Sequence, residues 1–153
     1  MIYLLRHGQA ESKGGGDDDA RRLTPEGERQ SHAAGRAIAA LGLQLDTCLT
    51  SPKVRAADTA RLACEHLPVE LEVAEELREG GFDSLALAAG RGNILLVGHN
   101  PDFVNEIARL TGARGKIRKG GLAIVDGDTL LALLRPEELA AIADGRNRSH
   151  VEP

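Results

Sequence analysis

The sequence alternates short apolar runs with longer segments of helical periodicity, and this alternation most strongly limits the possible fold. The run Ile94-Leu95-Leu96-Val97 is purely apolar, as expected for a strand that is covered on both faces. Comparable runs predict strands over 2–6, 46–50, 70–73, 93–98, 121–126 and 129–134. Apolar residues at helical spacing predict helices over 25–41, 53–67, 82–89, 101–111 and 136–143. This order is typical of an α/β protein with a layered sheet.

The last two predicted strands differ from the others in their connection. Asp126-Gly127-Asp128 separates them and has the composition of a tight hairpin turn, so these strands should pair antiparallel. We therefore expect an α/β three-layer sandwich, with a mostly parallel central sheet, helices on both faces and an antiparallel edge hairpin. In the second predicted helix, the residues that share one face are Val54, Ala57, Cys64 and Leu67.

The length of 153 residues suits one domain, and the sequence contains neither an internal repeat nor an interdomain linker. We expect a single domain over 1–153, with 145–153 as a flexible tail. Residues 11–20 are predicted to form a mobile polar loop. The acidic run within it, Asp17-Asp18-Asp19, could bind a metal ion, but no spaced ligands accompany it. A solvated loop is the favoured interpretation.

Composition excludes several classes of partner. Aromatic residues make up only 2% of the chain, and the net charge is −4. We therefore expect no nucleic acid partner, because there is little for bases to stack on and no basic footprint. No apolar run approaches the roughly 18 residues of a membrane span, and no signal peptide is recognisable. These features predict a cytoplasmic protein without a membrane partner, and the absence of a large apolar patch favours a monomer.

Cys48 and Cys64 are the only cysteines. They could form a disulfide, but reduced thiols fit a cytoplasmic protein better. Their spacing is not that of a metal site.

Three predicted helices begin with a small polar residue followed by proline: Thr24-Pro25, Ser51-Pro52 and Asn100-Pro101. Proline suits the first helical position, so each pair could simply be a helix cap. The second and third pairs, however, directly follow predicted strands. They mark strand carboxyl ends, where open α/β sheets bind their ligands.

Charged and titratable residues cluster at these strand ends. Arg6-His7-Gly8 follows the first strand, His99 follows the fourth, and Arg55 lies in the first turn after Ser51-Pro52. Two arginines and two histidines at three strand ends predict a positively charged pocket. Its natural ligand is a phosphoryl group, because arginine binds phosphate with planar, bidentate geometry.

The set of motifs resembles the histidine phosphatase, or phosphoglycerate mutase-like, superfamily. The matching pieces occur in the family's order and are Leu5-Arg6-His7-Gly8, Leu23-Thr24-Pro25-Glu26-Gly27, Ser51-Pro52 with Arg55-Ala56 and Thr59, and Gly98-His99-Asn100-Pro101. The short chain is similar to the SixA-type phosphohistidine phosphatases in particular. Arg21-Arg22-Leu23-Thr24 also resembles that branch's Arg-Pro-Leu-Thr, with Arg22 in place of the proline.

The resemblance implies a role for each matching residue. His7 would attack phosphorus and become a phosphohistidine, while Arg6, Arg55 and His99 would hold the phosphoryl oxygens. Gly8 and Arg21 would bind substrate, although Arg21 is equally explicable as a plain surface residue. No metal or other cofactor is expected, and the sequence contains no recognised metal-ligand spacing.

The sequence leaves open which residue donates a proton to the leaving group. In the acid-phosphatase branch an aspartate follows the second histidine, whereas here that position is Asn100. Leu77-Arg78-Glu79 can be aligned with the mutase branch, which would make Glu79 the general acid. Alternatively, Glu75-Glu76-Leu77 matches the SixA-type branch, which leaves Glu79 as a loop surface residue.

These features favour a phosphatase with a covalent intermediate on His7, acting on phosphohistidine of a signalling or carrier protein. A small-molecule phosphomonoesterase is the alternative within the enzyme class, and a non-catalytic phosphoprotein-binding module is the alternative outside it. Several remaining charged residues are predicted to lie on the surface: the histidines His32 and His66, and the basic cluster Arg114, Lys116, Arg118 and Lys119.

Overall fold

A computed structural model describes residues 1–145. It contains a six-stranded sheet in the order β3-β2-β4-β1-β5-β6. The strands are β1 (Ile2–Arg6), β2 (Thr47–Thr50), β3 (Leu71–Val73), β4 (Ile94–Gly98), β5 (Leu122–Asp126) and β6 (Thr129–Leu134). Strands β3, β2, β4 and β1 run parallel, and β5 and β6 add to β1 as an antiparallel hairpin. The expected sheet and its edge hairpin are confirmed.

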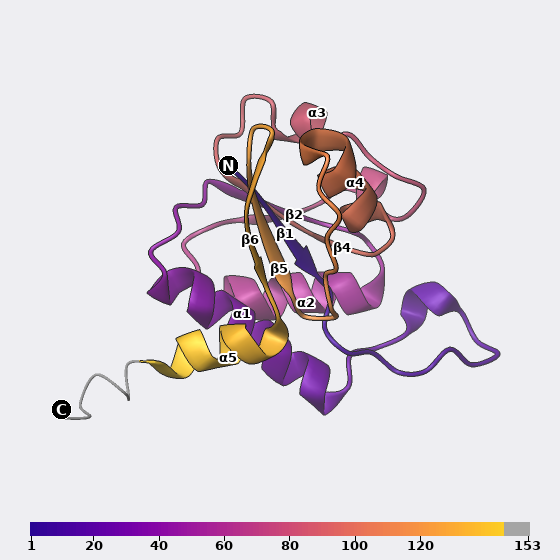
Figure 1. Cartoon of the computed structure of the whole chain (residues 1–153). Helices are drawn as coiled ribbons and strands as arrows, with labels where there is room; N and C mark the ends of the chain where they lie inside the picture. The colour runs from indigo at the N-terminus through magenta and orange to yellow at the C-terminus, as the bar shows by residue number, and fades with distance from the viewer. Residues whose placement is uncertain (146–153) are drawn as a thin grey trace, which may run out of the picture.

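The helices cover both faces of the sheet (Figure 1). The helices on one face are α1 (Pro25–Ala40), α2 (Val54–Cys64) and α5 (Pro136–Asp144). The helices associated with the other face are α3 (Ser84–Ala88) and α4 (Asp102–Thr111). Two short 3-10 helices, η1 (Asp18–Ala20) and η2 (Glu75–Leu77), lie in the connections.

The central strands alternate their side chains between two hydrophobic clusters, because successive residues of a strand point to opposite faces. Tyr3 and Leu5 of β1 join the cluster beneath α1, α2 and α5. Ile2 and Leu4 join the cluster beneath α4, where Phe103 is buried. Burial of β1 and β4 between two helical layers accounts for their apolar sequences.

Helix α2 differs from its sequence-based description in extent and in phase. It ends at Cys64 rather than at residue 67. The predicted apolar face is confirmed only in part. Cys64 and Leu67 pack against the core, but the fully buried small residues are Ala56, Ala60 and Ala63, and Val54 and Ala57 are half-buried. This phase places Arg55, on the adjacent side of the first turn, in the interior as well.

Cys48 and Cys64 are free thiols in the structure. Cys48 is buried, and a hydrogen bond with the Cys64 thiol raises its pKa, with burial adding to the effect. Within residues 1–145, no helix has both the length and the apolar composition needed to cross a bilayer. The expected tail over 145–153 lies, apart from Gly145, outside the described residues.

Candidate active site

The two histidines come together because their strands are neighbours. Strands β1 and β4 pair in parallel with Arg6 opposite Gly98, and the His7 amide donates to the Gly98 carbonyl at 3.0 Å. His7 and His99 therefore follow adjacent strand ends, with ring centroids 5.2 Å apart. Both side chains are buried, at 5% and 7% exposure. The structure thus brings together the two histidines that the sequence placed at separate strand ends.

A backbone contact fixes the orientation and the tautomer of His7. Its Nδ1 lies 2.7 Å from the Gly8 carbonyl oxygen, which can only accept a hydrogen bond. Nδ1 therefore carries the proton, and Nε2 keeps its lone pair. The pKa of His7 is lowered to about 3, mainly by burial, although the Gly8 hydrogen bond opposes the shift and His99, Arg55 and Arg6 add to it. His7 is consequently neutral at pH 7.

Ser51 orients His99. The His99 Nε2 lies 2.8 Å from the Ser51 Oγ, which also accepts the Lys53 amide at 3.2 Å. Ser51 can then donate its own proton to Nε2, which leaves the proton of the neutral imidazole on Nδ1. The pKa of His99 is lowered to about 3, first by burial and then by Arg55 and Lys53. Its Nδ1 is buried without a hydrogen-bond partner.

Arg6 and Arg55 bring two guanidinium groups to the same pocket. One nitrogen of Arg6, Nη1, donates to the Ile117 carbonyl at 2.9 Å, and Nη1 of Arg55 donates to the Asp18 carbonyl at 2.8 Å. In each arginine the Nε is buried and lacks a partner. Buried polar groups are normally satisfied, and both of these donors belong to residues that line one pocket, where an anion would suit them.

The pocket has a volume of about 870 Å³ and is lined mostly by charged and polar residues. The lining includes Arg6, His7, Lys53, Arg55, His99 and Asn100. Of the five buried, unpartnered side-chain atoms among the described residues, four belong to this lining: Arg6 Nε, Arg55 Nε, His99 Nδ1 and Asn100 Oδ1. Three of the four, Arg6 Nε, Arg55 Nε and His99 Nδ1, are nitrogen atoms of the kind that donate to a compact oxyanion.

The solvated loop expected over residues 11–20 is confirmed for residues 11–17, which are exposed, but not for two of its aspartates. Asp18 and Asp19 belong to η1 and contact the pocket's cations instead of facing only solvent. The Asp18 carboxylate lies 2.8 Å from Arg21 Nε, 3.3 Å from Arg55 Nη2 and 3.5 Å from Lys53 Nζ. Although burial opposes the shift, hydrogen bonds and charge interactions with Arg21 and Arg55 lower the pKa of Asp18 to about 2. Ion pairs with residues that are distant in the sequence hold this loop at the pocket. The local sequence does not reveal them.

Lys53 is a pocket residue that the sequence analysis missed. It is 6% exposed, and its Nζ lies within 3.7 Å of carboxylate oxygens of Asp18, Asp19 and Glu79. The sequence offered one signal for a pocket role: Lys53 lies between Ser51-Pro52 and Arg55, at a strand end that had already been singled out. An almost buried lysine with only partly exposed counter-ions adds to the positive charge of the pocket.

Three further residues were predicted to belong to the site, and only two of them line the pocket. Glu79 lies at the pocket rim, with its side chain 72% exposed and 3.7 Å from Lys53. Arg21 also lines the pocket. Gly8 does not line it: its amide donates to Thr59 Oγ1 at 3.0 Å, and a Cβ there would lie 2.6 Å from the Gly27 carbonyl oxygen. The structure therefore shows a packing role for Gly8, and its contact with substrate stays a prediction.

Comparison with known proteins agrees with this geometry. Residues 2–91 match the model of the histidine phosphatase superfamily (branch 1). The chain belongs to this superfamily. It is accordingly a hydrolase, as the strand-end motifs predicted.

One sequence relative and two solved structures show which histidine phosphatases this chain resembles. The phosphohistidine phosphatase SixA homolog of Haemophilus influenzae is 32% identical over 132 residues, covering 76% of this chain and 80% of that one. A SixA structure from Agrobacterium tumefaciens superposes with a TM-score of 0.78 at 23% identity, covering 88% and 97% of the two chains. A structure of the protein histidine phosphatase SixA complexed with tungstate gives 0.77 at 22% identity, covering 90% and 98%. The expected family and its α/β fold are confirmed.

Proposed function

We propose that this histidine phosphatase removes phosphoryl groups from phosphohistidine side chains of proteins, through a covalent intermediate on His7. One observation carries the proposal. The free Nε2 lone pair of His7 belongs to a ring buried in a pocket that also holds unpartnered donors of Arg6, Arg55 and His99. A nucleophile and an oxyanion clamp thus occupy one site.

In the first step, His7 Nε2 attacks phosphorus. A nitrogen–phosphorus bond forms on His7 while the phosphorus–nitrogen bond of the substrate breaks, and the leaving imidazole nitrogen takes up a proton. The Arg6 and Arg55 guanidinium groups and the His99 Nδ1–H hold the three phosphoryl oxygens. Each charge-assisted hydrogen bond contributes roughly 1.5–3 kcal/mol. The Gly8 carbonyl holds the proton on Nδ1 and stabilises the positive charge that develops on the His7 ring.

In the second step, water attacks the phosphoryl group of phosphorylated His7. The nitrogen–phosphorus bond breaks, inorganic phosphate leaves, and His7 returns to its neutral form with the water proton passed to the products. All of these steps use groups of the chain itself and water.

The leaving group sets the substrate class. Asn100, directly after His99, cannot act as a carboxylic acid, and the Glu79 side chain is mostly exposed. An imidazole nitrogen leaves without a strong proton donor, whereas an alkoxide needs one. The name of the Haemophilus influenzae relative and the tungstate complex of SixA support the same assignment, since tungstate is a tetrahedral oxyanion like phosphate.

A rate comparison tests the substrate class. We expect kcat/KM for a phosphohistidine-bearing protein to exceed kcat/KM for p-nitrophenyl phosphate and sugar phosphates by more than an order of magnitude. Higher values for a sugar phosphate would favour the small-molecule phosphomonoesterase. Phosphate binding without turnover of any of these compounds would favour the binding module.

Glu79 gives a second, more local test. If it protonates leaving groups, Glu79→Gln should slow hydrolysis of alkyl phosphates by about 10²-fold or more and hydrolysis of a phosphoramidate much less. Glu76→Gln, in the adjacent exposed 3-10 helix, is the matched control. Equal effects of Glu79→Gln on both substrates would show that Glu79 is not the general acid.

A further inference from the structure

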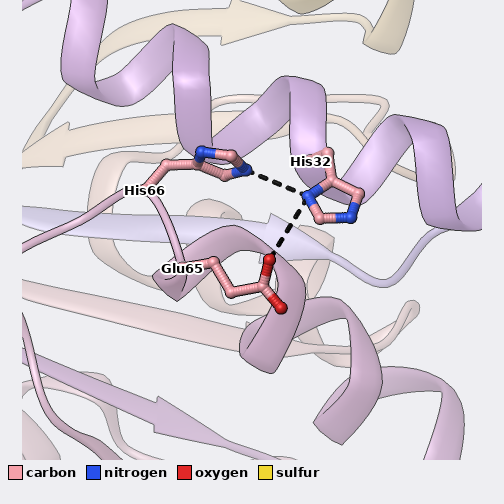
Figure 2. A group of neighbouring side chains, drawn as sticks. All are labelled: His32, Glu65 and His66. Carbon is pink, nitrogen blue, oxygen red and sulfur yellow. Dashed lines mark hydrogen bonds and ion pairs between the residues drawn. The ribbon is translucent and has the colours of Figure 1, made fainter.

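A second cluster of titratable side chains lies outside the pocket, between α1 and the end of α2 (Figure 2). His32 comes from α1, and Glu65 and His66 directly follow the last residue of α2. The His32 Nδ1 lies 2.9 Å from the His66 Nε2 and 3.9 Å from the Glu65 Oε2. One potential ligand atom from each residue lies within 4.8 Å of the other two. None of the three lines the active-site pocket.

The packing of α1 against α2 holds this cluster in place. Gly35 of α1 meets the backbone of Ala63 in α2 so closely that a Cβ on Gly35 would lie 2.2 Å from the Ala63 carbonyl oxygen. His32 is three residues before Gly35, and His66 is three residues after Ala63, so each histidine lies about one turn from the contact. The His66 amide also donates to the Ala63 carbonyl at 3.1 Å. Both imidazoles therefore project from a tightly packed helix pair.

The two carboxylate oxygens of Glu65 face different neighbours. Its Oε1 lies 3.8 Å from Arg61 Nη1, one turn earlier in α2, while Oε2 faces His32. The Arg61 contact orients the carboxylate and leaves Oε2 toward the ring nitrogens, as the dashed lines in Figure 2 show for His32. Such an outer partner is a usual support for a ligating carboxylate.

The donor set selects a class of metal ion. Two imidazole nitrogens and one carboxylate oxygen suit Zn²⁺ and its neighbours Co²⁺, Ni²⁺ and Cu²⁺, whereas Mg²⁺ and Ca²⁺ prefer oxygen alone. A tetrahedral Zn²⁺ with metal–nitrogen distances of about 2.0–2.1 Å separates its ligand atoms by about 3.4 Å. The observed separations of 2.9 and 3.9 Å lie on either side of that value. The shorter one is a hydrogen bond between the two rings, so the ion would replace this bond and the donating ring would carry its proton on its other nitrogen.

We propose that His32, Glu65 and His66 form a binding site for a divalent metal ion of the zinc class, independent of phosphatase chemistry. The three side chains fill three coordination positions, and water fills the rest. The ion ties the middle of α1 to the end of α2 and stabilises that helix pair. The sequence pattern did not reveal the site because its two histidines are 34 positions apart on different helices.

Titration calorimetry with ZnCl₂, in metal-free buffer, tests the site on the whole chain. We expect one equivalent of Zn²⁺ to bind, and His66→Gln or His32→Gln to weaken binding by more than the roughly 10–100-fold that loss of an outer partner costs. Glu65→Gln should weaken it less. His7→Gln is the matched control, since it removes an imidazole from the only other histidine pair in contact within the described residues. It should leave the one-equivalent binding intact.

Thermal melting distinguishes a variant that has lost a metal-binding side chain from one that no longer folds. In EDTA, His66→Gln should melt like the unaltered chain because His66 is only half-buried. Zn²⁺ should raise the melting temperature of the unaltered chain but not that of His66→Gln. The proposal is overturned if Zn²⁺ does not bind at one equivalent. It is equally overturned if binding survives His66→Gln or is lost in His7→Gln.

Discussion

At the scale of single residues, the pocket depends on charges held in place before substrate arrives. Burial and neighbouring cations keep His7 neutral, as the proposed nucleophile requires, whereas a free imidazole would be partly protonated near neutral pH. The same cations attract Asp18, which contacts Arg55 and Lys53. A phosphoryl group entering the pocket must compete with that carboxylate for both side chains.

Replacing this carboxylate should therefore strengthen oxyanion binding. We expect Asp18→Asn to lower the Kd for tungstate, and the KM for substrate, by roughly 5-fold, equivalent to about 1 kcal/mol for a partly exposed ion pair. Asp128→Asn, in the exposed hairpin turn away from the pocket, removes the same charge and should change neither value. Weaker binding by Asp18→Asn would instead mean that Asp18 is needed to position Arg55.

At the scale of secondary-structure elements, the close contact of α1 with α2 determines where Arg55 lies. Small residues on both helices allow the contact, and Gly35 allows the nearest approach. Alanine-rich packing of α2 on the sheet then sets the helix phase that buries Arg55. The position of Arg55, which we propose to bind phosphate, thus depends on residues outside the pocket.

Gly35→Ala tests the close contact between the two helices. Alanine is favoured over glycine within a helix by up to about 1 kcal/mol. The added Cβ, however, would lie 2.2 Å from the Ala63 carbonyl oxygen, and overpacking of this kind costs roughly 1–3 kcal/mol. We expect a net loss of unfolding free energy in urea denaturation. Gly14→Ala, where a Cβ meets nothing within 4 Å, should be neutral. A gain in stability for Gly35→Ala would contradict the described helix contact.

Most of the elements could be predicted from the sequence, and the reasons are visible in particular segments. Strands β1 and β4 are buried on both faces, which forces an apolar run, and the residues after them are polar because they face a site. The face of helix α2 was predicted only in part, because its fully buried small residues are alanines, which give a weak periodic signal. The ion pairs of Asp18 with Arg55 and Lys53 were missed since no local pattern links an acidic loop to a helix 37 positions away.

At the scale of the whole molecule, the site destabilises the fold in acid. His7 and His99 both have a folded-state pKa of about 3, below the ordinary value of 6.5. Between these values the unfolded chain binds protons that the folded chain does not, so stability falls as the pH falls. Above pH 6.5 both states are neutral and this contribution no longer changes.

The unfolding free energy should therefore drop between pH 7.5 and pH 5 by roughly 2 kcal/mol for each of these histidines. Urea denaturation at the two pH values measures the drop. His7→Gln should reduce it by about half. A pH-independent stability over this range would contradict neutral, buried histidines.

The covalent intermediate is the central claim, and trapping it on His7 tests that claim most directly. The chain is mixed with ³²P-labelled phosphohistidine protein, quenched with base within the first turnover and mapped by mass spectrometry. We expect label on His7 that is stable in base and lost in acid, with none on the folded His7→Ala variant and no turnover by that variant. Continued phosphate release by His7→Ala, or label on another residue, would contradict the mechanism.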